Sequence, residues 1–266
     1  MPHHYRPDTK TARECWYREL IIGFEDGTEE RFYIELTQTG THIPQPILEP
    51  ASWVKLDHQK CPDCPLTSDF CRYCPAAESL ESTLLRLKDH FSTEKVTARA
   101  IDGAHRETVV KQSLQSVGTA LVQLAVFSSG CPIGKEFRPM LSDLRPFSTN
   151  RELSRHLVSK LLLKHRGEID AVRSEMMDKL EPLREVFSHL CCRLPIDSKG
   201  DAMANSIISV DASTTSIALE IDEAVKELAQ EMGWDRKKML KARAQRKNGE
   251  RKSFWSRIKA LFSSND

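Results

Sequence analysis

The stretch from residue 16 to residue 36, WYRELIIGFEDGTEERFYIEL, contains two apolar runs on either side of an Asp-Gly step. Apolar side chains recur at every second position in both runs, at Leu20, Ile22, Phe32 and Ile34. A period of two is typical of strands with one buried face, and Asp26-Gly27 suits the tight turn of a hairpin. The stretch therefore predicts an antiparallel β-hairpin.

The same signature recurs once further along the chain. Residues 94–112 repeat it around Asp102-Gly103 and predict a second hairpin. Residues 53–56 are a candidate for a further short strand. Elsewhere apolar residues recur at helical spacing, and Thr149 with Glu152 has the pattern of a capping box. We expect helices over residues 77–91 and 114–127, from 149 onward, over 169–194 with Pro182 kinking or dividing it, and over 203–210 and 217–232.

These elements predict an α+β protein. Antiparallel β-hairpins with a four-cysteine metal loop form the N-terminal part, and a mainly helical C-terminal half follows. We place an α+β domain with the metal site at residues 1–147, a helical region at 148–233 and a basic tail at 234–266. A chain of 266 residues is long enough for one or two such domains.

The loop between the hairpins carries half of the chain's eight cysteines. In CPDCPLTSDFCRYCPAA, residues 61–77, they form two C-x-x-C pairs, Cys61 with Cys64 and Cys71 with Cys74. Each pair can bring two sulfurs onto one ion, and two pairs complete a tetrahedral zinc site. Four thiolates also hold iron–sulfur clusters. The motif predicts a metal site and leaves zinc and iron–sulfur open, with zinc favoured.

Prolines set this loop apart from common cysteine motifs. Pro65 and Pro75 directly follow the second cysteine of each pair, and proline has no backbone N–H to donate to a sulfur. The usual zinc knuckle is therefore not expected, whereas Cys-Pro steps do occur at iron–sulfur ligands. A redox C-x-x-C normally opens a helix inside a βαβ unit, and that context is not found here. Cys131, in SSGCPIG, is a candidate fifth ligand or reactive thiol, but a buried core position is the favoured interpretation.

The C-terminal tail is strongly basic. Residues 235–266 contain 11 Lys and Arg against 3 Asp and Glu, although the whole chain has a net charge of only +1. An apolar face at helical spacing follows the basic run, formed by Phe254, Trp255, Ile258, Leu261 and Phe262. Such a helix can lie on an anionic membrane surface or dock on a partner protein. Nucleic acid is a less favoured partner, because no reader motif accompanies the charge.

No catalytic motif is recognisable in the chain. It has no G-x-S-x-G, no phosphate-binding loop, no G-x-G-x-x-G and no H-E-x-x-H. The polar start is unlike a secretory signal, so we expect a cytoplasmic protein, peripheral at the inner membrane surface if the tail binds lipid. In that compartment thiols stay reduced, so clustered cysteines indicate metal ligands or redox groups rather than disulfides. The favoured function is a non-enzymatic, zinc-binding interaction protein; an iron–sulfur redox protein and a nucleic-acid-binding regulator are the alternatives.

Four short motifs taken together resemble an uncharacterised bacterial family of cysteine-cluster proteins. They are CPDCPL, CRYCPAA, SSGCPI and RPFST. The resemblance covers residues 16–232 and leaves the basic tail outside. It implies no activity.

Overall fold

A computed structural model describes residues 19–33, 35–37, 40–42, 49–102, 105–141, 144–194 and 200–232. These residues form an α+β fold, which confirms the predicted class. Its antiparallel four-stranded sheet has the order β2-β1-β5-β6. The strands are β1 (Glu19–Gly23), β2 (Glu29–Tyr33), β5 (Lys95–Ile101) and β6 (Glu107–Ser113), and a small second sheet pairs β3 (Glu35–Thr37) with β4 (Gly40–His42).

Both predicted hairpins are present. In the first, the Phe24 amide donates to the Thr28 carbonyl at 2.9 Å, and Gly27 takes the positive φ of 85° that the turn requires. The second hairpin pairs β5 with β6 in antiparallel register, and β1 joins the two hairpins by pairing with β5. The sheet is thus two Asp-Gly hairpins placed side by side.

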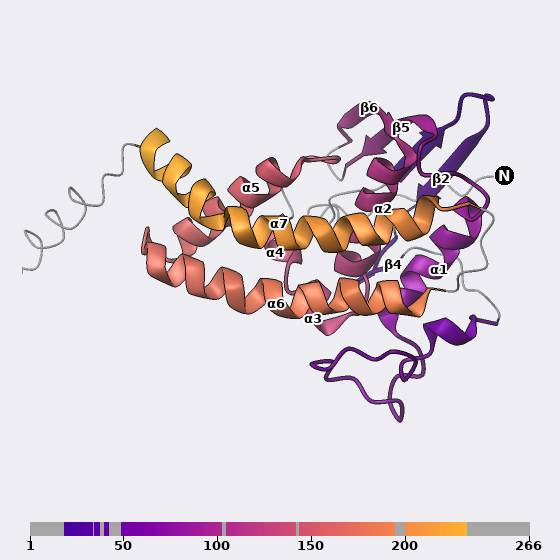
Figure 1. Ribbon diagram of the computed structural model, residues 1–266, viewed down its shortest axis with the longest axis horizontal. Coiled ribbons are helices and arrows are strands. Elements are labelled where there is room, and N and C mark those ends of the chain that lie inside the picture. The colour runs from indigo at the N-terminus through magenta and orange to yellow at the C-terminus, as the bar shows by residue number, and fades with distance from the viewer. Residues whose placement is uncertain are drawn as a thin grey trace, which may run out of the picture. The chain divides into compact units, whose positions relative to one another are not determined.

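One face of this sheet is apolar and packs on helices. Leu20 and Ile22 of β1 stand opposite Ala100 and Ala98 of β5, and all four are fully buried. The helix α2 (Leu114–Ser128) contacts β5 and β6 on this side. Most of its residues are buried, although Ser116, Thr119 and Gln123 form a polar stripe on one side, and it is the central helix of the fold (Figure 1).

The remaining helices surround α2. Their bounds are η2 (Ser52–Val54), a 3-10 turn, then α1 (Pro75–Leu87), α3 (Pro132–Lys135), α4 (Arg138–Leu141), α5 (Asn150–Lys164), α6 (Ile169–Arg193) and α7 (Ala202–Glu231). The α5 helix starts with the predicted capping box, in which Thr149 and Glu152 bind each other's backbone amides. Gly118 of α2 packs closely against the first part of α7. A Cβ at position 118 would lie only 2.1 Å from the Ser206 hydroxyl oxygen.

Two sequence predictions about secondary structure are wrong. Residues 53–56 form no regular strand; η2 occupies their start, and Lys55 makes only an isolated bridge to Tyr73. Residues 202–231 form one continuous helix instead of two stretches. The polar segment in its middle stays helical because the helix buries a face there at Val210, Thr214 and Ile217. The Thr214 and Thr215 hydroxyls are satisfied by donating to the carbonyls four residues earlier. Pro182 likewise lies inside α6 without dividing it.

The chain divides into two compact units, Met1–Ile221 and Asp222–Asp266. The predicted boundary at residue 147 falls within the first unit. The predicted docking tail at 234–266, with its apolar face, lies outside the described residues. No helix in the described part of the chain has a stretch long and apolar enough to cross a bilayer.

Candidate functional site

The cysteine-bearing loop, residues 49–74, is fastened to the rest of the first unit by a buried arginine. Arg193, the last residue of α6, is only 2% exposed. Its guanidinium donates to three loop carbonyls, Trp53 at 3.1 Å, Lys55 at 2.7 Å and Leu56 at 3.0 Å. This one side chain therefore holds the start of the loop against the end of α6.

Backbone bonds fold the same loop back on itself. The Cys74 amide donates to the Val54 carbonyl at 2.8 Å, and the Leu56 amide donates to the Arg72 carbonyl at 3.0 Å. Glu81 of α1 accepts from the Ala51 amide at 2.6 Å. The two C-x-x-C pairs are thus presented by a loop whose two ends are held together.

Cysteines from both pairs line one small pocket. Cys61 and Cys64 of the first pair, and Cys74 of the second, meet there with Cys131 at the start of α3. The cavity has a volume of about 20 Å³, and apolar side chains of α6, Val186 and Leu190, close it. Arg193 is the charged residue of the lining. The structure thus brings together three of the four predicted ligands and adds Cys131.

Cys71, the fourth predicted ligand, does not line this pocket. Its thiol donates a hydrogen bond to the Tyr73 carbonyl at 3.0 Å. Cys61, Cys64, Cys71 and Cys74 are all free and partly buried. They differ in which of them line the pocket.

The sulfurs that share the pocket do not yet form a closed coordination shell. In the described part of the chain, no three Cys, His, Asp or Glu side chains stand close enough around one point to hold an ion. A zinc–sulfur bond is about 2.3 Å long, so the side chains would have to turn inward to bind. Metal binding is commonly coupled to such ordering, and four thiols around one small cavity are a chemically suitable set of donors.

Burial keeps two of the pocket thiols, those of Cys61 and Cys131, protonated at neutral pH by raising their pKa. It raises the pKa of Cys61 to about 12, with further contributions from the neighbouring sulfurs of Cys74, Cys131 and Cys64. Burial likewise raises the pKa of Cys131 to about 11. Reactive and redox cysteines have lowered pKa values, so Cys61 and Cys131 do not suit nucleophilic chemistry.

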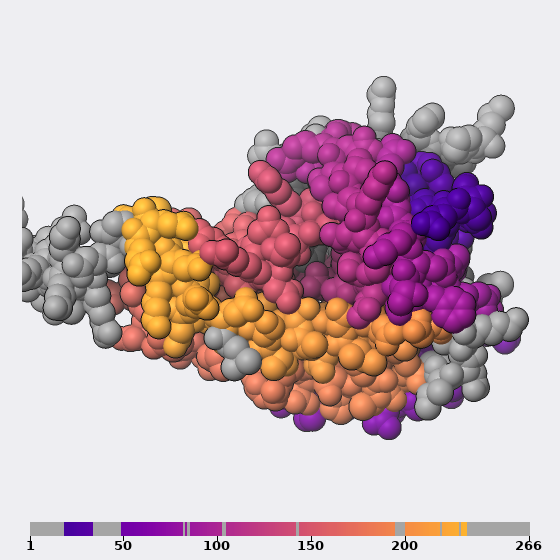
Figure 2. All heavy atoms as spheres, turned by 45° about the horizontal axis from the view of Figure 1, so that its top comes forward, coloured from indigo at the N-terminus to yellow at the C-terminus, as the bar shows by residue number. Residues whose placement is uncertain are grey.

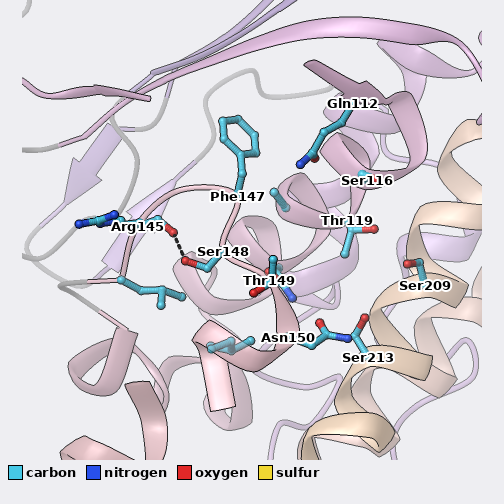
Figure 3. Close-up of a pocket in the computed structure, with 14 residues that line it drawn as sticks. Gln112, Ser116, Thr119, Arg145, Phe147, Ser148, Thr149, Asn150, Ser209 and Ser213 are labelled. Carbon is cyan, nitrogen blue, oxygen red and sulfur yellow. Dashed lines mark hydrogen bonds between the residues drawn. The ribbon is translucent and has the colours of Figure 1, made fainter. Parts of the chain in front are cut away.

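A second, larger cavity was not anticipated from the sequence. It has a volume of about 290 Å³ and lies between α2, the start of α5 and α7. Figure 2 shows it as a hollow between the segments around residues 115 and 150, above α7. Figure 3 shows Thr119 of α2 and Ser209 and Ser213 of α7 on one side of it, with the α5 N-terminus opposite.

Apart from Arg145, the polar groups that line this cavity are uncharged. Its lining contains Ser, Thr, Gln and Asn side chains but no Asp, Glu, His or Cys. The hydroxyls at the α5 end have local partners, because Ser148 donates to the Arg145 carbonyl at 2.7 Å and Thr149 takes part in the capping box. The Arg145 side chain points away from the α7 serines in Figure 3. No acid–base pair for catalysis is therefore present among the described lining residues.

Comparison with known proteins places the chain in a family. Residues 17–233 match the model of a domain of unknown function, DUF6901. The chain belongs to the DUF6901 family. The match contains the sheet, the cysteine loop and α2 to α7, so the pocket of the four cysteines lies wholly within the DUF6901 domain. No curated protein and no solved structure matches the chain.

Proposed function

We propose that this DUF6901 protein is a non-enzymatic metal-binding protein whose cysteine loop is fastened to the helices by a zinc ion. The observation that carries the proposal is the meeting of Cys61, Cys64 and Cys74, from both C-x-x-C pairs, at one buried pocket. Zinc would there supply the cross-link that neutral thiols cannot. Coordination of such a site contributes directly to folding free energy.

The size of the cavity favours a single ion. A volume of about 20 Å³ is close to that of one water-sized sphere. A closed, four-sulfur zinc site has no open position for substrate. A structural role is therefore the one that this donor set supports.

An iron–sulfur centre is the second candidate, and the Cys-Pro steps favour it. Proline follows Cys64 and Cys74, as it follows a cysteine ligand of bacterial ferredoxin clusters. On this alternative the same sulfurs serve electron transfer.

Elemental analysis and an absorption spectrum of the full chain, purified without oxygen, separate these functions. We expect about one zinc per chain and no visible absorption. A brown protein that air bleaches would replace zinc by an iron–sulfur cluster. Preparations with neither metal would refute the proposal.

We further propose that the tail brings the protein to an anionic membrane surface at the cytoplasmic face, with a partner protein as the alternative target. The support is sequence alone: the apolar positions Trp255 and Ile258 beside the run of Lys and Arg. Sedimentation with phosphatidylserine vesicles is the test. Binding should be lost in a variant with Asp at both positions, and equal binding by that variant would refute the proposal.

A further inference from the structure

A sequence feature separates the cysteines of the pocket from the others. Every cysteine that lines it is followed by proline, at Pro62, Pro65, Pro75 and Pro132. Cys71 is followed by Arg72, and the described cysteines of α6 are likewise followed by residues other than proline. Position around the pocket and the Cys-Pro step therefore select the same four residues.

We infer that the metal ligands are Cys61, Cys64, Cys74 and Cys131, and that Cys71 is not a ligand. This inference rests on the proposed function, because it names the residues of the same site. It changes the predicted set in one place, where Cys131 takes the position that the sequence pattern gave to Cys71. The centre then joins the cysteine loop to the corner between α2 and α3.

Backbone geometry supports the pairing of Cys74 with Cys131. Cys74 precedes α1 with φ −71° and ψ 117°, and Cys131 precedes α3 with φ −59° and ψ 119°. Proline occupies the next position in both, and it holds the preceding residue in this extended conformation. The two steps are neighbours, because a Cβ on Gly130 would lie 3.4 Å from the Pro75 Cβ. Two equivalent Cys-Pro steps thus face one cavity from adjacent segments.

Charge provides a second, independent argument. Arg193 lines the pocket and is buried, yet its guanidinium has only backbone carbonyls as partners among the described residues. A buried cation is normally paired with an anion. One Zn²⁺ with four thiolates carries a net charge of about −2. The cysteine centre therefore supplies an anion that Arg193 does not have among the described residues.

The local contacts of Cys71 agree with its exclusion. Its thiol is engaged with the Tyr73 carbonyl, next to the bridge between Lys55 and Tyr73. That contact ties the sulfur to its own loop.

Thiol footprinting on the full chain, as purified with its metal, tests the assignment without any substitution. Iodoacetamide should label Cys71 while Cys61, Cys64 and Cys74 stay protected, and a chelator should then expose these three. All four are partly buried, so Cys71 is the control for the others. Protection of Cys71 together with the three, or protection that a chelator leaves unchanged, would overturn the inference.

Three single variants provide a second test of the ligand set: Cys131→Ser, Cys71→Ser and, as a control, Cys192→Ser. Cys192 is the control because it is exposed. Zn²⁺ affinity, measured by competition with a chromophoric chelator, should fall by more than about 100-fold in the first, since a ligand matters more than the residues that support it. The other two should stay within about threefold of the unmodified chain. If the centre is an iron–sulfur cluster, its visible absorption replaces Zn²⁺ affinity as the measured quantity, on the same three variants.

The outcomes separate the two proposals. An unmodified chain that binds no metal refutes the proposed function itself. A chain that binds metal, loses it in Cys71→Ser and keeps it in Cys131→Ser refutes only the ligand set. If Cys131→Ser does not fold, retained affinity in Cys71→Ser still supports the set, and lost affinity there still overturns it.

Discussion

At the scale of single residues, Arg193 has the largest structural role that the sequence did not reveal. Its guanidinium donates to three carbonyls of the cysteine loop, and it lies at the C-terminal end of α6. A cation is favourable at that end of a helix because it meets the partial negative charge of the last carbonyls. The Arg193 side chain thus supplies the hydrogen-bond donors for three loop carbonyls, and its positive charge lies at the cysteine pocket.

Arg193→Met should lower the free energy of unfolding by about 3 kcal/mol, because buried carbonyls lose their donor. Urea denaturation followed by circular dichroism measures this loss. Arg184→Met on the same helix is the control, since that side chain is partly exposed and pairs with the surface residues Glu181 and Glu185; it should change stability by less than about 0.5 kcal/mol. Equal effects of the two substitutions would contradict this account of Arg193.

At the scale of elements, the close approach of α3 to α2 fixes the position of Cys131. A Cβ at Gly134 would lie 2.5 Å from the Val126 carbonyl oxygen, a distance that forces the backbone to move. The Gly134 amide also points at the Cys131 sulfur at 3.5 Å. Packing of one helix against another thereby places a sulfur at the pocket.

Gly134→Ala should displace α3 and destabilise the fold by about 2 kcal/mol, because the added methyl overpacks a fixed backbone contact. Gly130→Ala is a suitable control, since its Cβ would meet Pro75 at an ordinary contact distance of 3.4 Å. Thermal unfolding of both variants tests this. A Gly134→Ala protein as stable as Gly130→Ala would show that α3 can shift freely.

The capping box at the start of α5 gives this element a pH dependence. Hydrogen bonds from the Thr149 backbone amide, and then from its hydroxyl, lower the pKa of Glu152. A lowered pKa contributes stability above the ordinary value of about 4.3, and this contribution disappears as the pH falls through the folded value. Glu152→Gln should therefore be less stable than the unmodified chain at pH 7, with the difference shrinking below about pH 4. Stability curves from pH 3 to 7 check this, and a difference that persists at pH 3 would point to a cause other than the charge.

At the scale of the whole molecule, α2 and the cysteine pocket join the parts of the first unit. The sheet and α1 contact α2 directly, and α3, which carries Cys131 at its start, contacts both α2 and α6. The loop between the hairpins is thereby linked to helices that come much later in the chain. A metal at this point would cross-link the N-terminal and C-terminal parts of the unit.

Chelation should therefore lower the melting temperature of the full chain by about 5–10 °C, because a ligand bound only to the folded state adds to its stability. Scanning calorimetry with and without a zinc chelator measures the shift. The double variant Cys61→Ser/Cys74→Ser should melt at the lower temperature and respond to no chelator. A melting temperature that is the same in all of these samples would leave the cysteine centre without a structural role.

Sequence alone determined the features that depend on neighbours along the chain. Alternation around Asp26-Gly27 predicted a strand pair because side chains in a strand change face at every residue. Thr149 and Glu152 predicted a helix start because a capping box needs only four consecutive residues. Helical periodicity located α2, α5 and α6 for the same reason. The gap expected between residues 210 and 217 is absent from the structure, since burial of Val210, Thr214 and Ile217 keeps this part of α7 helical.

Only the tertiary structure decided which distant residues meet. Spacing in the cysteine loop grouped Cys71 with Cys74, whereas folding brings Cys131 to the pocket and leaves Cys71 bonded to its own loop. In the sequence, nothing distinguishes Arg193 from any other basic residue near the end of a helix. Its burial, and the arrival of Cys131, result from the packing of α3 and α6 around α2, and no local pattern encodes a contact between segments so far apart.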